Sequence, residues 1–210
     1  MKRSKRGMRV TTLFTDIGGV LLTNGWDHNS RRAAADQFQL DCAEMESLHH
    51  TAFDALERGK ITLKQYLDLV VFHKKRPFTR ARFERFMYAQ SEALPEMLGY
   101  MARLKARHHL KIAVVSNEGR ELNAHRIRKF KLDGFVDFFV SSCFVQIRKP
   151  EPSMFRLALD MSQADPGEVV YIENTPMFVK IAEDLGIRSI LHSDYESTRA
   201  KLDSFGLRLD

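Results

Sequence analysis

The sequence contains few of the features that mark secreted, metal-rich or membrane-spanning chains. Only two of its 210 residues are cysteines, Cys42 and Cys143. They lie far apart and show no metal-ligand spacing, so we expect a reducing, cytoplasmic setting. No apolar run approaches the roughly 18 residues of a membrane-spanning helix. No internal repeat or low-complexity segment is present. With 44% hydrophobic and 29% charged residues, the composition is typical of a globular protein with a full core.

The positive charge of the chain does not mark a nucleic-acid-binding surface. The formal net charge is +6 at pH 7, which in general favours anionic ligands. Four basic residues stand within residues 1–6. We expect a disordered tail there, because Asp16 interrupts the apolar segment that a signal peptide would need. The other basic residues alternate with acids and form no basic ribbon with aromatic residues. We therefore expect neither a nucleic-acid nor a membrane partner.

The segment 24–90 has the pattern of a compact group of helices. Ser30 is the expected N-cap of a helix that runs to about residue 39. Apolar residues at helical spacing predict a second helix over 42–57, and Thr62 and Thr79 are the expected N-caps of two more. No strand pattern occurs in this segment.

Outside that segment, strands and helices alternate. The expected strands are 10–15, 111–115, 135–140, 169–172 and 188–191, and the expected helices are 97–107, 121–130, 153–162 and 177–185. Near-continuous apolar strands in such an alternation are typical of a parallel sheet that is covered on both faces. We predict an α/β fold with a Rossmann-like parallel sheet core, formed by residues 1–23 and 91–210. An all-helical domain, 24–90, is inserted after the first strand.

Polar residues follow the predicted strands where each strand ends. The segments are Asp16-Ile17-Gly18-Gly19, Ser116-Asn117, Lys149-Pro150 and Glu173-Asn174. Because the carboxyl ends of parallel strands meet at one edge of a sheet, we expect these side chains near one small ligand. Two acids suit a magnesium ion, and a carboxylate, a hydroxyl and a lysine suit phosphoryl transfer.

These segments, in this order, resemble the motifs of the haloacid dehalogenase-like (HAD) superfamily. The resemblance rests on strand-D-x-G-G-V-L, S-N after a second strand, K-P, and an acid after Tyr-Ile. It covers about residues 10–192. A helical insert directly after the first motif is the smaller cap arrangement of that superfamily. The resemblance implies a HAD-like hydrolase, a Mg²⁺ cofactor and a small phosphorylated metabolite as the substrate.

The resemblance also implies roles for the matching residues. Asp16 matches the nucleophile that forms an aspartyl-phosphate intermediate and also contacts the metal. Ser116 matches the residue that hydrogen-bonds the phosphoryl group, and Lys149 matches the lysine that neutralises its charge. The expected metal ligands are Asp16, the Gly18 carbonyl, Glu173 and Asn174.

Three further residues are expected beside the substrate. Asn117 is adjacent to Ser116, and Glu118 follows it, although an acid there also suits the N-terminal end of the next helix. Trp26 follows the nucleophile loop, where hinge residues border a closed site. Packing of the hinge is the alternative role for Trp26.

The match departs from the usual phosphatase pattern at two positions. Gly18 stands where such enzymes have an aspartate that protonates the leaving group, a function typically worth about 10²–10⁴-fold in rate. Asp27, His28 and Glu118 are candidates to replace it. The pair Glu173-Asn174 stands where two aspartates are common, which predicts weaker metal binding.

Two basic pairs on the predicted insert helices are not expected to form sites. Arg31 and Arg32 are expected on a solvated helix face, although they could reach an anionic substrate. His49 and His50 are adjacent on a helix, so their side chains diverge and only one could face a shared metal ion.

Two other functions stay open at this stage, as does the oligomeric state. Asn174 is shared with the superfamily's dehalogenases, but those have an aromatic residue two positions after the nucleophile and no acid where Glu173 stands. A protein that binds a phosphometabolite or a partner without turnover is the second alternative, which Gly18 favours. The intact nucleophile, hydroxyl, lysine and acid positions favour retained chemistry.

Overall fold

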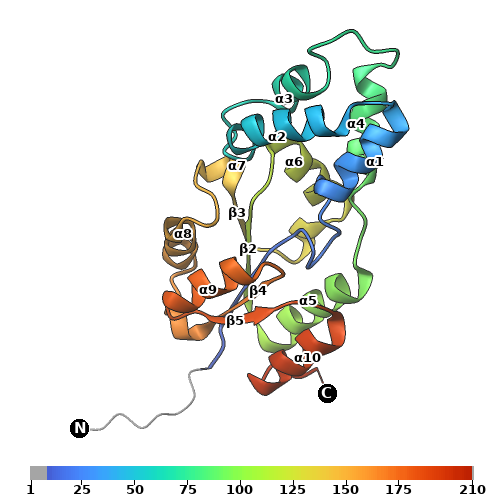
Figure 1. Cartoon of the computed structure of the whole chain (residues 1–210). Helices are drawn as coiled ribbons and strands as arrows, with labels where there is room; N and C mark the ends of the chain where they lie inside the picture. Colours follow the sequence, from blue (N-terminus) through green and yellow to red (C-terminus); the bar gives the residue numbers. More distant parts are fainter. Residues whose placement is uncertain (1–8, 210) are drawn as a thin grey trace, which may run out of the picture.

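The computed structural model describes residues 9–209 and has the predicted α/β architecture (Figure 1). In this part of the chain, five parallel strands form one sheet in the order β3-β2-β1-β4-β5, so the first strand is central. The strands are β1 (Thr12–Thr15), β2 (Lys111–Ser116), β3 (Phe138–Ser141), β4 (Val169–Glu173) and β5 (Arg188–Leu191). The predicted disordered tail, 1–6, lies outside the described residues.

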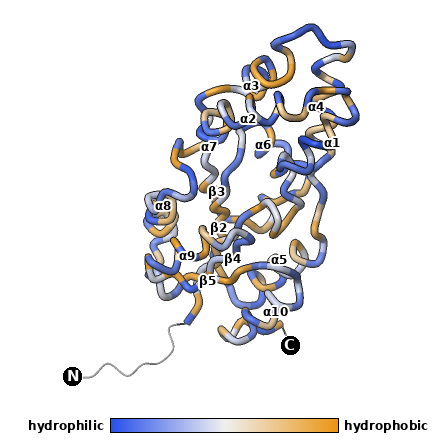
Figure 2. The backbone as a smooth tube through the Cα atoms, viewed as in Figure 1, coloured by the Kyte–Doolittle hydropathy of each residue, from blue (hydrophilic) through white to orange (hydrophobic). Residues whose placement is uncertain are grey.

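Helices cover both faces of the sheet, as the continuous apolar strands predict. On one face, Leu13 and Val114 pack under α5 (Pro95–His108), α6 (Arg120–Lys129) and α10 (Tyr195–Ser204). On the other face, Phe14 and Ala113 pack under α8 (Pro152–Ser162) and α9 (Pro176–Asp184). In Figure 2, hydrophobic segments gather along the sheet and the inner sides of these helices.

The predicted helical insert is present between β1 and β2. It consists of α1 (His28–Phe38), α2 (Cys42–Glu57), α3 (Leu63–Val70) and α4 (Arg80–Ala89). These helices share a hydrophobic core of their own, which includes Phe38, Tyr66 and Phe83. Figure 1 shows them stacked beyond the carboxyl ends of the strands. Thr62 caps α3 in a capping box with Gln65, and Thr79 caps α4, as predicted.

The two chain segments that join the insert to the core run side by side. The Thr23 backbone N–H donates to the Glu92 carbonyl at 2.9 Å, and the Thr23 hydroxyl donates to the Gln90 carbonyl at 2.7 Å. Leu22 also forms a β-bridge with Ala93. The predicted boundaries at residues 23/24 and 90/91 therefore lie in two connecting segments that are hydrogen-bonded to each other. The division into two domains stays a prediction.

Several element boundaries differ from the predicted ones. Asp27, not Ser30, is the N-cap of α1, because its carboxylate accepts the Ser30 backbone N–H at 2.9 Å. The strand predicted over 135–140 begins only at Phe138. Residues Leu132–Gly134 form a 3₁₀ turn, and the Asp137 carboxylate accepts the Ile112 N–H at 2.7 Å instead of continuing the strand.

Short and terminal elements were not predicted at all. A one-turn helix, α7 (Ser142–Val145), follows β3, and a 3₁₀ turn (Pro166–Glu168) precedes β4. The alternating apolar pattern ends at residue 191, yet α10 follows and is capped by Asp194, whose carboxylate accepts the Ser197 N–H at 2.7 Å. None of the helices within residues 9–209 has the length and apolarity to cross a membrane.

Candidate active site

The ends of the three central strands bring the predicted motif residues together. Asp16 follows β1, and its backbone N–H donates to the Ile172 carbonyl of β4 at 3.0 Å. Ser116 is the last residue of β2, and Glu173 is the last residue of β4. A cavity of about 220 Å³ opens above them, and its walls include Asp16, Gly18, Asn24, Ser116, Lys149 and Asn174. The predicted convergence at one edge of the sheet is therefore what the fold produces.

Lys149 is the centre of the site. Its side chain is buried, and the Nζ atom lies 3.1 Å from Asp16 Oδ2 and 2.6 Å from Glu173 Oε2. The same ammonium donates to the Tyr171 hydroxyl at 3.1 Å, and Tyr171 in turn donates to Glu173. One buried cation thus fixes the position of the candidate nucleophile and of the acid behind it.

The charges in this cluster set its protonation states. Burial alone would lower the pKa of Lys149, but the carboxylates of Asp16 and Glu173 outweigh burial and raise it. Burial, together with the charge of Asp16, raises the pKa of Glu173 against the opposing effect of Lys149. Two carboxylates against one ammonium leave a surplus of negative charge at the floor of the cavity, which favours the approach of a cation.

Glu173 is placed beneath the cavity and does not line it. The residue is fully buried, its Oε2 atom accepts from Lys149 and Tyr171, and its Oε1 atom accepts the Thr175 backbone N–H at 2.8 Å. This placement differs from the predicted role of a direct metal ligand. The reason is that Lys149 lies between the two acids, and we infer that Glu173 positions Lys149.

The loop after Asp16 brings neutral oxygen donors to the same cavity. Gly19 has a φ of +71°, and a Cβ atom there would lie 2.0 Å from Asn174 Nδ2, so glycine permits the close approach of Asn174. The Asn174 amide donates to Asn24 Oδ1 at 3.4 Å, and Gly18 lies beside Asn24. Asn24 was not predicted as a site residue, since an asparagine in a turn is ordinary.

This donor set fits magnesium, with Asp16 as the carboxylate ligand, since Glu118, which also lines the cavity, is paired with Arg126. Magnesium takes one or two carboxylates and other oxygen ligands and keeps several waters. Asp16, Gly18, Asn24 and Asn174 supply one carboxylate and neutral oxygens around one cavity. No group of three or more His, Cys, Asp or Glu side chains within residues 9–209 is arranged to hold a metal ion. A magnesium ion at Asp16 would therefore depend on neutral donors and on substrate oxygens.

Ser116 and Asn117 differ in what their side chains do. Ser116 lines the cavity beside Lys149, as predicted for a phosphoryl contact. Asn117 donates through Nδ2 to the Lys149 carbonyl and accepts the Lys149 backbone N–H, both at 2.9 Å. Because both ends of its amide are engaged, the geometry gives Asn117 the task of holding the Lys149 loop. Its predicted contact with the substrate stays a prediction.

A buried ion pair closes the side of the cavity that faces the insert. Glu118 and Arg126 contact each other and are both nearly inaccessible to solvent. Arg126 also donates to Ser91 Oγ and to the Asn24 carbonyl, at 2.9 Å and 2.7 Å. Burial raises the pKa of Glu118, and Arg126 opposes that rise. Arg126 was missed because an arginine on a charged helix predicts a solvated side chain.

A smaller cavity of about 80 Å³ lies next to the first and shares Asn24, Asn117, Glu118 and Arg126 with it. Trp26 lines this second cavity, and its Nε1–H donates to the Tyr66 hydroxyl at 2.9 Å. Tyr66 is in turn 2.9 Å from His49 Nδ1. We assign the Tyr66 proton to His49, because among the described residues the buried hydroxyl has no other partner to which it could donate. That arrangement makes His49 Nδ1 an acceptor, which only a neutral imidazole offers.

The remaining candidates lie away from the Asp16 cavity. Asp27 is engaged as the α1 cap, and His28 is exposed, with its Nδ1 3.4 Å from Glu46. Arg31 is buried and forms a two-point ion pair with Glu46, which corrects the prediction of a solvated face for this residue. His50 is exposed and bonds the Glu46 carbonyl through Nδ1. Of the three candidate acids, Glu118 is the one that reaches the site.

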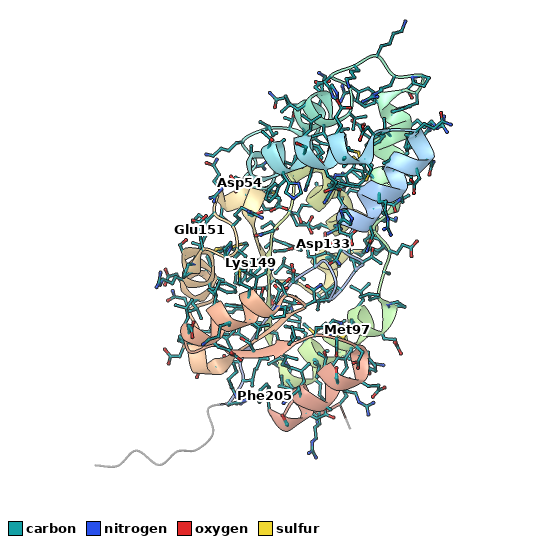
Figure 3. The ribbon with its side chains drawn as sticks, in the orientation of Figure 1. Asp54, Met97, Asp133, Lys149, Glu151 and Phe205 are labelled. Carbon is teal, nitrogen blue, oxygen red and sulfur yellow. The ribbon has the colours of Figure 1, made fainter. Side chains whose placement is uncertain are left out.

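Ion pairs on α2 attach the insert to the loop that carries Lys149. Arg58 contacts Asp54 on its own helix at 3.0 Å and Glu151 of the core at 2.5 Å. Arg148, the neighbour of Lys149, lies 2.6 Å from Glu57. Figure 3 labels Asp54 and Glu151 at this junction, with Lys149 further inside the core. The insert is therefore held over the site at a second place besides the hinge.

Comparison with known proteins assigns the chain to a family. A sheet with the order 3-2-1-4-5, an acid after the central strand and a lysine from a following loop define a class of α/β hydrolases. The family model of haloacid dehalogenase-like hydrolases matches residues 10–198. The chain belongs to this family, as its motifs predict.

The chain spans only part of the length of the curated relatives that it matches. "Bifunctional epoxide hydrolase 2" of Rattus norvegicus is 29% identical in an alignment of 167 residues that covers 71% of this chain and 30% of the rat protein. PpaX of Caldanaerobacter subterraneus, provisionally named a pyrophosphatase, is 29% identical over 134 residues, 64% of this chain and 54% of that protein.

Solved structures share the fold at low identity. The HAD family enzyme BT-2542 of Bacteroides thetaiotaomicron, in complex with magnesium and inorganic phosphate, has a TM-score of 0.72 at 18% identity, over 90% of this chain and 98% of that one. L-2-haloacid dehalogenase of Xanthobacter autotrophicus has a TM-score of 0.61 at 14% identity, over 95% of this chain and 84% of that one. At these identities the likeness establishes the fold.

The neutral state of His49 predicts a loss of stability in mild acid. Burial, and secondly the charge of Arg31, lower the pKa of His49 from 6.5 to about 4. The unfolded chain therefore takes up this proton first, and the stabilisation is lost as the pH falls from about 6.5 to about 4. We expect the urea midpoint to drop between about pH 7 and pH 5, and to drop less in His49→Gln. His50→Gln, on the same helix, should keep the wild-type drop, and an equal drop in His49→Gln would contradict the assignment.

Proposed function

We propose that this protein is a magnesium-dependent phosphatase of a small phosphorylated metabolite, acting through an aspartyl-phosphate at Asp16. The observation that carries the proposal is the 3.1 Å contact between Lys149 Nζ and Asp16 Oδ2 in a cavity that Ser116 also lines. The magnesium and phosphate bound to BT-2542, and the name of PpaX, support the same class of ligand.

The reaction follows from the positions of these three side chains. An oxygen of Asp16 attacks phosphorus, so that an Asp16 O–P bond forms while the ester O–P bond breaks and the leaving oxygen takes a proton. Water then attacks the same phosphorus and gives its proton to the group that protonated the leaving oxygen, the Asp16 O–P bond breaks, and inorganic phosphate leaves with the carboxylate restored. A bound magnesium ion would offset phosphate charge and orient its oxygens. Lys149 orients Asp16 and offsets negative charge beside it, and Ser116 donates to a phosphoryl oxygen.

The proton for the leaving group has to come from a residue other than 18. Glu118 lines the cavity, and burial raises its pKa, which favours a carboxyl able to hold a proton. Arg126 opposes this by stabilising the carboxylate form. We infer that Glu118 is a weak general acid, so the enzyme acts slowly or on substrates with good leaving groups.

The smaller cavity next to the site suits the organic part of the substrate. One side of it is apolar or aromatic, formed by Trp26, Phe53, Leu56 and Leu122, and the rest is polar, with Asn24, His49, Glu57, Asn117, Glu118 and Arg126. Its limited volume of about 80 Å³ favours a small leaving group. This arrangement supports Trp26 and Glu118 as substrate-contacting residues.

Particular residues favour two other functions, a binding protein without turnover and a dehalogenase. The lack of a side chain at Gly18 favours a protein that binds a phosphometabolite or a partner without turnover. Asn174 and the fold shared with L-2-haloacid dehalogenase favour a dehalogenase. The surplus negative charge contributed by Glu173 favours phosphate chemistry with a cation over a metal-free dehalogenase, so we rank the phosphatase first.

The proposal predicts magnesium-dependent phosphate release from a panel of phosphorylated metabolites. Asp16→Asn should lower the rate by about a thousandfold or more, because the nucleophile is lost. Asp27→Asn makes the same chemical change at the α1 cap, where asparagine caps as well as aspartate, and should keep the wild-type rate. Phosphate release is measured with and without magnesium.

Either of two results would contradict this proposal. Phosphate release that persists in a folded Asp16→Asn variant would show that Asp16 is not the nucleophile. No release from any compound, with magnesium bound and the protein folded, would favour the binding protein, and turnover of 2-haloacids without magnesium would favour the dehalogenase.

Restoring an acid at position 18 should increase the turnover of poor leaving groups. A Cβ atom on Gly18 would lie 3.4 Å from Asn24, an ordinary contact, so a side chain fits there. We expect Gly18→Asp to raise kcat by about tenfold or more, and Gly18→Asn, which has the same shape without the acid, to give no gain. Equal rates in the wild type and Gly18→Asp would mean that Glu118 already supplies the proton.

A further inference from the structure

A large pocket lies on the outer side of the helical layer, away from Asp16. It opens between α5 and α10, has a volume of about 770 Å³ and shares no lining residue with the Asp16 cavity. We call it the α5–α10 pocket and define it by Tyr100, Arg103, Arg107, Tyr195, Arg199 and Asp203. Its size is that of a site for a small organic molecule rather than an inorganic ion.

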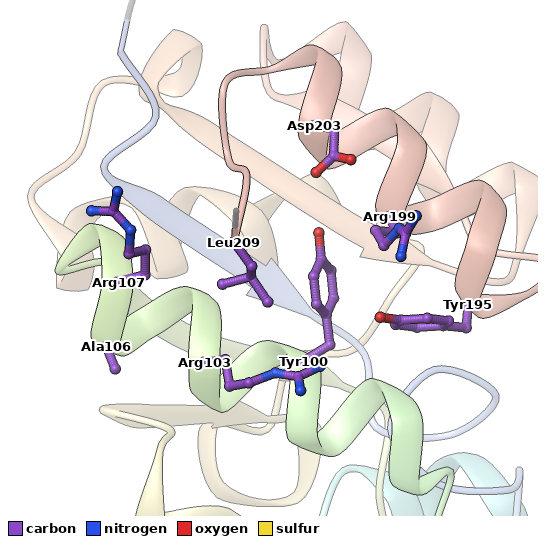
Figure 4. Close-up of a pocket in the computed structure, with 8 residues that line it drawn as sticks. All are labelled: Tyr100, Arg103, Ala106, Arg107, Tyr195, Arg199, Asp203 and Leu209. Carbon is purple, nitrogen blue, oxygen red and sulfur yellow. The ribbon is translucent and has the colours of Figure 1, made fainter.

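A buried hydroxyl in this pocket has no partner within residues 9–209. Tyr100 is 1% exposed, and its hydroxyl oxygen makes no hydrogen bond with a described residue. Figure 4 shows this hydroxyl pointing from α5 toward Asp203 and Arg199 of α10. Burial raises the pKa of Tyr100, so the group stays a neutral O–H. A buried hydroxyl is normally paired, and a bound molecule would supply the missing partner.

The charges around the pocket favour an anion that also carries hydroxyl groups. Three arginines, Arg103, Arg107 and Arg199, and one carboxylate, Asp203, line the pocket. Arg199 lies 3.6 Å from Glu196 at the rim. Guanidinium groups bind phosphate through paired hydrogen bonds. Asp203 only accepts hydrogen bonds, so it would repel a bare anion and suits a sugar hydroxyl.

The apolar part of the wall suits a ring. The Tyr195 ring is partly exposed and lies edge-on to Tyr100, with centroids 5.4 Å apart. Leu209 adds an aliphatic surface beside it. Aromatic side chains favour planar rings placed against their faces.

We propose that the α5–α10 pocket binds a nucleoside monophosphate. The phosphate contacts the arginines, the ribose hydroxyls donate to Asp203, the Tyr100 hydroxyl bonds a ligand oxygen, and the base lies against Tyr195. The surplus of two positive charges in the lining matches a phosphate monoester, which carries about −1.5 to −2 at pH 7. This site is independent of the proposed hydrolysis at Asp16.

Calorimetric titration of the full chain with AMP tests the proposal. We expect saturable binding of one AMP per chain. Tyr100→Phe, which removes only the unpartnered oxygen and keeps the ring packing, and Arg103→Gln should each raise Kd by about tenfold. Arg85→Gln removes an equal charge from the exposed face of α4 and should leave Kd unchanged. Adenosine and inorganic phosphate should each bind more weakly than AMP, and melting curves check that each variant folds.

Three results would overturn the proposal. The first is no saturable AMP binding at millimolar concentrations. The second is binding that Tyr100→Phe and Arg103→Gln leave unchanged in folded protein but Asp16→Asn abolishes, because AMP would then occupy the Asp16 cavity. The third is inorganic phosphate binding as tightly as AMP, because the ring and ribose would then contribute nothing.

Discussion

A single buried ammonium group holds the active-site end of this fold together. Lys149 Nζ lies between Asp16 and Glu173 at hydrogen-bonding distance from both. Burying three charges is costly unless each is paired and hydrogen-bonded. Tyr171 and the Thr175 N–H complete the partners of Glu173. Removing the lysine would leave two acids facing each other without a cation, a loss of about 3–5 kcal/mol for typical buried pairs.

The same interaction determines the chemistry of the site. Because Lys149 is fixed from behind by Glu173 and along its backbone by Asn117, it presents its charge to Asp16 in one position. Pre-placed charge of this kind stabilises a transition state without reorganisation. The insert completes the enclosure, because core Arg126 bonds Asn24 at the hinge, core Arg148 pairs with Glu57 of α2, and Arg58 of the insert pairs with Glu151. Exclusion of water strengthens each of these electrostatic contacts.

Much of the fold follows from the local pattern of the sequence. Continuous apolar strands separated by helical spacing indicate a parallel sheet, and Thr62 and Thr79 mark helix starts by their capping chemistry. The errors occur where a tertiary contact outweighs local preference. Phe135 and Val136 have strand-forming side chains. The Asp137 carboxylate, however, accepts the Ile112 N–H of the neighbouring strand, and β3 begins only after Asp137. Asp27 and Ser30 both suit an N-cap, and only the three-dimensional path of the loop selects Asp27.

The motif residues of the site were predictable because a parallel sheet brings its carboxyl ends together. The supporting residues were not. Arg126, Tyr171 and Asn24 lie close to the motifs in the sequence, but they are ordinary residue types for a helix, a strand and a turn. Glu173 shows the limit most clearly. Its position after β4 suggests a metal ligand, whereas it lies buried behind Lys149 and bonds the lysine ammonium, from which we infer that it positions this lysine.

The central claim is that Asp16 is the nucleophile. Quenching the enzyme in acid during turnover of a phosphate ester, followed by mass analysis of its peptides, tests this claim directly. The account predicts one phosphoryl group on the peptide that contains Asp16, present only while substrate remains and in amounts that fall when Lys149 is replaced. Turnover without any phosphorylated Asp16 peptide, or a phosphoryl group on another residue, would contradict it.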